Sequence, residues 1–181
     1  MMTENVELDF ESLLRPQFDY LYRIAYRFTG NKADAQDLVQ ELLIKLYPRA
    51  KELGKVSSLR PWLVRVLYRL FLDSERKQMR SPLRLVKSKD AFNTENPLDQ
   101  LHGSEPDPEQ YTQQRNLAEH IQQALGRLSK DQRAVITLHD IEGYRLNELE
   151  ALLEVPLGTL KSRLHRARAN LKEILEKKGT F

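Results

Sequence analysis

The sequence has no cysteine, which excludes disulfide bonds and thiolate metal ligands and is typical of a reducing compartment. It also has no run of the ~18 to 20 apolar residues that a membrane-spanning helix needs. The acidic start, MMTENVELDF, lacks the apolar stretch of a signal peptide. We therefore expect a cytoplasmic protein without membrane insertion, and its 181 residues, 40% of them apolar, are enough for one large or two small domains.

Signals of catalysis are missing as well. The chain has no glycine-rich phosphate-binding loop and no cysteine nucleophile. Its four histidines, at positions 102, 120, 139 and 165, do not have metal-ligand spacing, and His120 and His139 are interpreted as ordinary helix residues. We predict no enzymatic activity, no metal site and no cofactor.

Charge is distributed in blocks along the chain. Residues 60–90 contain nine cations and three acids, a net charge of +6, whereas residues 91–119 contain one cation and six acids, a net charge of −5. A second basic block lies at 158–171, where GTLKSRLHRARANL contains five Lys, Arg or His and no acid. This pattern is compatible with a polyanion bound at two places, or with solvated helix surfaces.

Proline and polar residues divide the chain in two. The segment 81–110 has four of the eight prolines and no sustained apolar period, which predicts a flexible linker. We place an N-terminal domain at residues 1–85, the linker at 86–110 and a C-terminal domain at 111–181.

Apolar residues on both sides of the linker recur mostly at helical spacing, and no segment alternates with a period of two. The fold class predicted is therefore all-α, with two small helical domains. Helix ends are expected at Gly30-Asn31 and near Pro48, and a capping box is expected at Ser129 and Gln132. The predicted apolar positions are Phe18, Leu21, Ala25 and Phe28; Leu38, Leu42, Ile44 and Leu46; Leu63, Val66, Leu67 and Leu70; and Leu117, Ile121, Ala124, Leu125 and Leu128.

Two short helices near 148–153 and 158–175 are separated only by a tight turn, which predicts a helix-turn-helix. On a helical wheel, one stripe of the second helix is apolar: Leu157, Leu160, Leu164, Ala167 and Leu171. The polar crest opposite has Thr159, Ser162, His165 and Arg166, and Lys161, Arg163, Arg168 and Lys172 flank the stripe. Such a helix suits the major groove, with crest side chains at base edges and flanking cations at phosphates.

Four segments together resemble the extracytoplasmic-function sigma factors of the bacterial sigma-70 family. VPLGTLKSRLHRARANL is similar to the promoter-binding helix of that family and ADAQDLVQELLIKLY to its polymerase-binding helix. PWLVRVLYRLFLDSERKQMR resembles its melting and minus-ten segment, and LSKDQRAVITLHDIEGY the start of its C-terminal domain. The resemblance implies a transcription initiation factor that binds core RNA polymerase and promoter DNA, and that has an anti-sigma factor as a further partner.

The resemblance also assigns roles to residues. It implies that the polymerase is bound by Asp37, Gln40 and Glu41, and the minus-ten DNA by Arg65, Arg69, Arg76, Lys77 and Arg80. It implies that the minus-thirty-five DNA is bound by Thr159, Lys161, Ser162, Arg163, His165, Arg166 and Arg168, although Arg163 could instead pair with an acid of its own domain. Trp62, Tyr68 and Phe71 could hold an unstacked base, but core packing is the favoured interpretation. The loop AKELGKVSSLR corresponds to the one that captures a flipped base in the family.

Some positions depart from the family. Arg145 stands where Ser is usual, Glu150 where a small Ala is usual, Glu154 where Gly is usual at the turn, and Arg69 where Asn is common. Because Arg145 removes a capping side chain, we predict that the helix starts instead at Asn147, with Glu150 bonding back to that start. The sequence offers no physical account of Glu154.

Two other functions fit the sequence. A two-domain helix-turn-helix regulator acting without polymerase would bind a two-fold symmetric site as a dimer. A sigma-like decoy would bind only an anti-sigma factor, but it would not need the acid-free basic helix.

Overall fold

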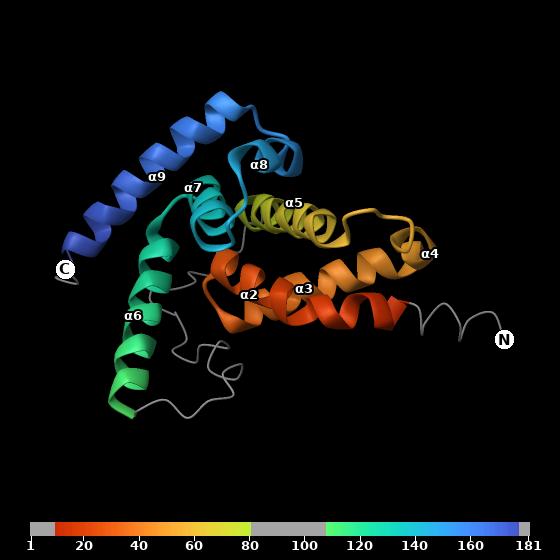
Figure 1. The fold of residues 1–181 in the computed structure, drawn as a ribbon, viewed down its shortest axis with the longest axis horizontal. Helices are drawn as coiled ribbons and strands as arrows, with labels where there is room; N and C mark the ends of the chain where they lie inside the picture. The colour runs from red at the N-terminus through yellow and green to blue at the C-terminus, as the bar shows by residue number, and fades with distance from the viewer. Residues whose placement is uncertain (1–9, 81–107, 178–181) are drawn as a thin grey trace.

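The structure, a computed structural model, describes residues 10–80 and 108–177, with side chains described for residues 10–74 and 117–177. These residues form helices and turns without a strand, which confirms the all-α prediction (Figure 1). The helices of the N-terminal domain are α2 (Phe18–Thr29), α3 (Lys32–Leu46), α4 (Ala50–Leu53) and α5 (Leu59–Arg80). Those of the C-terminal domain are α6 (Pro108–Arg127), α7 (Lys130–Ile136), the π-helical turn η4 (Thr137–Ile141), α8 (Leu146–Leu153) and α9 (Leu157–Lys177).

Local capping signals end α2 and start α7 where the sequence predicts. Gly30 ends α2 in the left-handed conformation, with φ of 83°, and its N–H donates to the Tyr26 carbonyl. Asn31 caps α3, since its side-chain oxygen accepts from the Asp34 N–H at 2.8 Å. Ser129 and Gln132 form the predicted capping box at the start of α7.

The core of the N-terminal domain lies between α2, α3 and α5. Phe28 stacks on Phe71 with ring centroids 5.1 Å apart, and both rings are fully buried. Most of the predicted apolar positions are buried. Val66 and Ile121 are half-buried, and Phe18, Ile44 and Leu117 are 45%, 66% and 45% exposed. Ile44 is two residues from both Leu42 and Leu46, and a step of two residues, ~200° on a helix, places it on the opposite face.

The two domains pack directly against each other. Buried residues of both belong to one contiguous hydrophobic core, and α2 contacts both α6 and α7 (Figure 1). Arg133 of α7 donates to the Phe28 carbonyl at 2.7 Å and to the Gly126 carbonyl at 2.7 Å. Gln122 of α6 donates to the Tyr26 carbonyl at 3.0 Å. Burial lowers the pKa of Arg133 to about 10, so its guanidinium still carries a charge at neutral pH.

Residues 86–107 of the predicted linker lie outside the described residues. Helix α6 begins at Pro108, so the last three residues predicted as linker, 108–110, are helical. Within the described ranges, none of the helices combines the length and the apolar character needed to cross a membrane.

Candidate nucleic-acid interface

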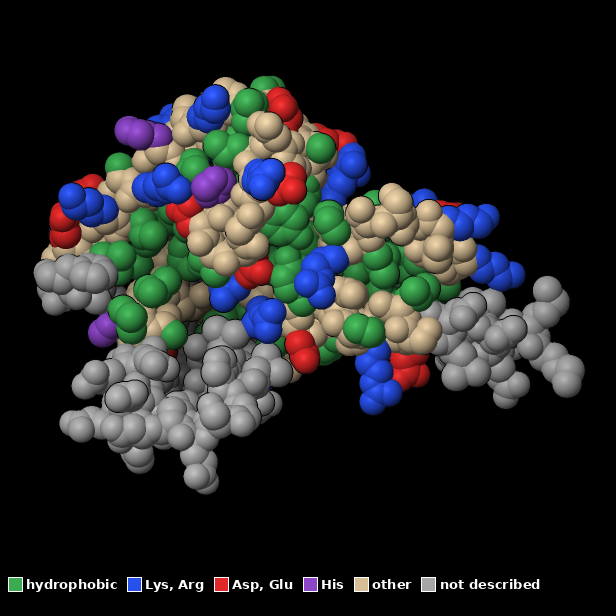
Figure 2. Space-filling view, in the orientation of Figure 1, with side chains coloured by type: hydrophobic (Ala, Val, Ile, Leu, Met, Phe, Trp, Pro, Cys, Tyr) green, Lys and Arg blue, Asp and Glu red, His purple; other side chains and the backbone are tan. Residues whose placement is uncertain are grey.

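Helix α9 has the two faces that the sequence predicts. Leu160, Leu164 and Ala167 are buried against the rest of the domain, where α9 contacts α6, α7 and α8. The exposed face presents Lys161, Ser162, His165, Arg166 and Arg168, and Figure 2 shows Lys, Arg and His side chains along this helix. Thr159 and Arg163 are half-buried. The buried stripe therefore fixes which side of α9 meets solvent.

The start of α8 and the turn between α8 and α9 both differ from our prediction. Helix α8 starts at Leu146 and not at Asn147, because the Glu148 carboxylate accepts from the Arg145 N–H at 2.7 Å and so bonds the amide at the N-cap position. The Arg145 side chain makes no capping bond. Glu150 does not bond back to the start of α8: its Oε1 accepts from the Leu157 N–H, the first amide of α9, at 2.8 Å.

Glu150 therefore stabilises the start of the candidate recognition helix. The first N–H groups of a helix have no partner within the helix, and they carry its positive dipole end. A carboxylate from the preceding helix satisfies one of them and holds the turn between the two helices.

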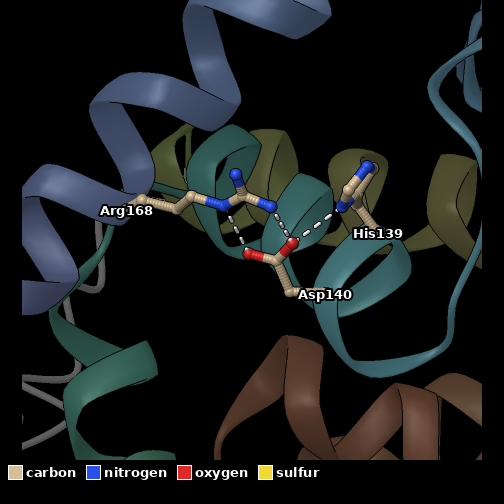
Figure 3. Close-up of polar contacts among 3 residues, drawn as sticks. All are labelled: His139, Asp140 and Arg168. Carbon is tan, nitrogen blue, oxygen red and sulfur yellow. Dashed lines mark hydrogen bonds and ion pairs between the residues drawn. The ribbon is translucent and has the colours of Figure 1, made fainter.

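Two of the predicted DNA-binding arginines pair with acids of their own domain. Arg163 forms an ion pair with Asp131 at 3.2 Å, which is the alternative that the sequence left open. Arg168 binds both oxygens of Asp140, at 2.9 and 2.5 Å, and His139 Nδ1 lies 2.7 Å from one of them (Figure 3). The hydrogen bond from Arg168 lowers the pKa of Asp140, and Asp140 raises the pKa of Arg168. The ion pair thus partly cancels the charge that Arg168 brings to this surface.

The other cations of α9 are placed differently. Lys161 and His165 have no ion pair within the described part of the chain. Arg166 makes only a weak bond, from its Nε to the Ser162 carbonyl at 3.3 Å. These side chains are available for an external partner.

Helix α5 presents a second pair of cations. Arg65 and Arg69, one helical turn apart, both bind the Glu154 carboxylate of the turn between α8 and α9, with the Arg69 bond at 2.5 Å. The side chains of Arg76, Lys77 and Arg80, also predicted to bind DNA, lie outside the described residues. The contact with Glu154 joins a predicted minus-ten site to the other domain, which no local sequence pattern indicates.

The three aromatic residues of α5 have two different environments. Tyr68 and Phe71 are buried, which confirms the interpretation as core residues, and burial raises the pKa of Tyr68 to about 12. Trp62 is half-buried and lines a surface pocket of about 230 Å³. The pocket is formed with Arg49 and with four residues of the loop predicted to capture a base: Glu52, Leu53, Lys55 and Val56.

The predicted polymerase-binding residues share the exposed side of α3. Asp37 and Gln40 are exposed and Glu41 is half-buried. Ile44, one turn beyond Gln40, extends this face with a large apolar side chain. Ile44 was grouped with Leu38, Leu42 and Leu46 as an apolar position of this helix, although its two-residue spacing from Leu42 and Leu46 indicates a different face.

No metal centre was predicted, and the side chains that the structure describes include no group of three His, Asp or Glu that could hold an ion. His102 lies outside the described residues.

Two family models match the chain. Sigma-70 region 2 matches residues 16–81. Sigma-70, region 4 matches residues 118–171. The first range contains the Arg65 and Arg69 pair, and the second contains the helix-turn-helix.

Individual relatives match over most of the chain. The ECF RNA polymerase sigma factor SigE of Mycolicibacterium smegmatis is 36% identical over 92% of this chain, which spans 62% of the length of that relative. The ECF RNA polymerase sigma factor SigW of Bacillus subtilis is 31% identical over 87% of this chain and 83% of its own length. A solved structure of the sigma factor RpoE in complex with the anti-sigma factor NepR, from Bartonella quintana, has a TM-score of 0.67 and 27% identity, and covers 93% of this chain and 97% of the other.

Proposed function

Because the chain belongs to the extracytoplasmic-function sigma factors of the sigma-70 family, we propose that it directs core RNA polymerase to specific promoters and helps to open them, without catalysing a reaction itself. The observation that carries the proposal is the exposed face of α9, where Lys161, His165 and Arg166 project without an acid beside them in the sequence. A helix held by a buried stripe and presenting cations and hydroxyls fits the major groove of the minus-thirty-five element.

The N-terminal domain supplies the other two contacts. Arg65 and Arg69 bind the backbone of the minus-ten element, together with Arg76, Lys77 and Arg80. The Trp62 pocket accepts a base displaced from the duplex, because a half-buried aromatic side chain beside an open pocket of about 230 Å³ offers a stacking surface.

The face of α3 binds core polymerase. Asp37 and Gln40 offer polar groups to a basic partner. Ile44 is exposed to water in the free protein, and burying its apolar surface against the polymerase would favour binding. Each DNA-binding domain alone is expected to bind weakly, and the polymerase would raise the affinity by fixing their separation. An anti-sigma factor is a further partner, as it is for the Bartonella relative, and the site of action is the cytoplasm.

The test is to mix the purified chain with bacterial core polymerase, measure co-elution, and sequence the transcripts started on genomic DNA. Co-elution with starts at a shared two-part promoter is the expected result. Binding to polymerase without transcription would favour the decoy. Tight duplex binding without polymerase would favour the simple regulator.

Two variants make the test specific to α3. Ile44→Asp is expected to abolish co-elution while the unfolding temperature stays unchanged, because the side chain is 66% exposed and contributes little to the core. Lys51→Glu, a charge change at an exposed residue of α4, is the control and should co-elute normally. Equal co-elution of both variants would place the polymerase contact elsewhere.

A further inference from the structure

One carboxylate of the C-terminal domain binds two arginines of the N-terminal domain. Oε2 of Glu154 accepts from Arg69 Nη2 at 2.5 Å, and its Oε1 accepts from Arg65 Nη2. The arginines are four residues apart on α5, so their guanidinium groups converge on the same oxyanion. Two guanidinium groups placed around one anion can also bind a phosphate.

The backbone at Glu154 indicates that the side chain matters. Glu154 follows α8 with φ of 57° and ψ of 42°, and among the described residues it is the only one other than glycine with positive φ. This left-handed position at a helix end favours glycine, since a Cβ is disfavoured there. A glycine would relieve the backbone but would lose both contacts with α5.

A larger interface surrounds this contact. The Arg27 and Glu142 side chains, only 18% and 9% exposed, form an ion pair between the domains. The Tyr20 and Tyr144 hydroxyl groups lie 3.1 Å apart, and α5 contacts α8. Glu154 and Arg69, by contrast, are 52% and 54% exposed, so they form a solvent-accessible part of the interface.

We propose that Glu154 helps to hold the free protein closed on itself by occupying Arg65 and Arg69 in place of a minus-ten phosphate. This inference rests on the proposed function, which assigns the two arginines to promoter DNA. The closed form neutralises the minus-ten cations but leaves the Lys161, His165 and Arg166 face of α9 exposed. Binding of both promoter elements at once then requires the two domains to separate.

The exposed position of the contact suits a reversible closure. Ion pairs that contact solvent are weak and are screened by salt, so promoter phosphates can compete for the arginines. The Glu154 carboxylate is charged at neutral pH, and the hydrogen bond from Arg69 lowers its pKa further. Closure is therefore expected to weaken as the salt concentration rises.

The experiment measures closure without using DNA. Because the chain has no cysteine, Ser57→Cys and Ala151→Cys can carry a donor and an acceptor dye at exposed positions beside α5 and on α8. Energy transfer in the full chain is recorded from about 50 to 500 mM salt for four proteins: the parent, Glu154→Gln, Arg69→Gln and the double variant. Glu176→Gln, which removes an exposed acid at the far end of α9, is the control of equal charge.

Glu154→Gln is expected to shift the closed-to-open ratio about three- to tenfold toward open and to reduce its salt dependence. The shift should be smaller when Arg69 is already Gln, since the two residues then share the same contact. Glu176→Gln should leave the ratio unchanged. Equal shifts of Glu154→Gln in both backgrounds, or no shift at all, would overturn the closure.

A second readout tests the masking of DNA. Binding of a minus-ten oligonucleotide by the free protein should tighten about three- to tenfold in Glu154→Gln relative to Glu176→Gln. Closure without this gain would overturn the masking role. Failure of the proposed function has a different signature. A protein that starts no promoter-specific transcription with polymerase contradicts the proposed function. The coupling between Glu154 and Arg69 is measured without DNA or polymerase and tests the closure by itself.

Discussion

Glu150 Oε1 accepts a hydrogen bond from the Leu157 N–H at 2.8 Å, so the last turns of α8 cap the first turn of α9. Resemblance to the family would place a small residue at position 150. In this chain the glutamate gives the helix-turn-helix a bond between its own two helices, outside their buried contact. The orientation of α9 therefore depends partly on one exposed carboxylate.

Glu150→Ala is expected to lower the free energy of unfolding by about 1 kcal/mol, a typical cost of removing a helix cap. It should also weaken binding to a minus-thirty-five duplex, because α9 loses a fixed start. Urea unfolding and fluorescence anisotropy measure the two effects. Glu150→Gln keeps an acceptor oxygen and should retain most of the stability. Equal stability of Glu150→Ala and the wild type would show that the hydrogen bond contributes nothing.

Arg133→Met is expected to lower the free energy of unfolding by ~2 to 3 kcal/mol, because a charged donor to Phe28 and Gly126 is lost and their carbonyls lose a partner. Thermal and urea unfolding measure the change. Arg127→Met, at an exposed residue of α6, is the matched control and should be neutral. Similar losses in both variants would mean that any lost arginine destabilises the protein.

Periodicity predicted most of the buried positions where the apolar spacing was three or four, with Phe18 and Leu117 as exposed exceptions. Leu160, Leu164 and Ala167 are buried on α9 as expected, and so are Leu63, Leu67 and Leu70 on α5. The same pattern does not account for Ile44, because this residue is apolar but lies two residues from Leu42 and Leu46 and so on the opposite face of the helix. An exposed apolar side chain such as that of Ile44 is a feature of surfaces that bind another protein.

Contacts between distant segments could not be predicted from local patterns. Glu154 lies 85 positions from Arg69, and Asp140 lies 28 from Arg168. An acid in place of the usual glycine was a visible departure, but only the packing of α8 on α5 shows which cations it meets. The basic surfaces could therefore be predicted from the sequence, whereas the acids that bind them could not.

Asp140→Asn is expected to strengthen binding to any duplex, because it removes the carboxylate that neutralises Arg168 (Figure 3). The slope of log affinity against log salt should become steeper by about one unit as one more phosphate contact forms. Titrations of one specific and one random duplex at several salt concentrations measure this. Glu173→Gln, which frees Lys177 near the end of the helix, is the control; an equal gain there would indicate a general charge effect.

Arg166→Ala is expected to cost about 1 to 3 kcal/mol of discrimination at one or two base positions, because the exposed guanidinium can reach base edges in the major groove. Arg168→Ala should instead weaken all sequences about equally, since it removes a backbone contact and leaves the Asp140 carboxylate without its partner near the phosphates. Binding to a library of minus-thirty-five duplexes, each with one base pair changed, separates the two effects. Equal, sequence-independent losses from both changes would contradict the placement of Arg166 at base edges and would make α9 a backbone-binding helix only.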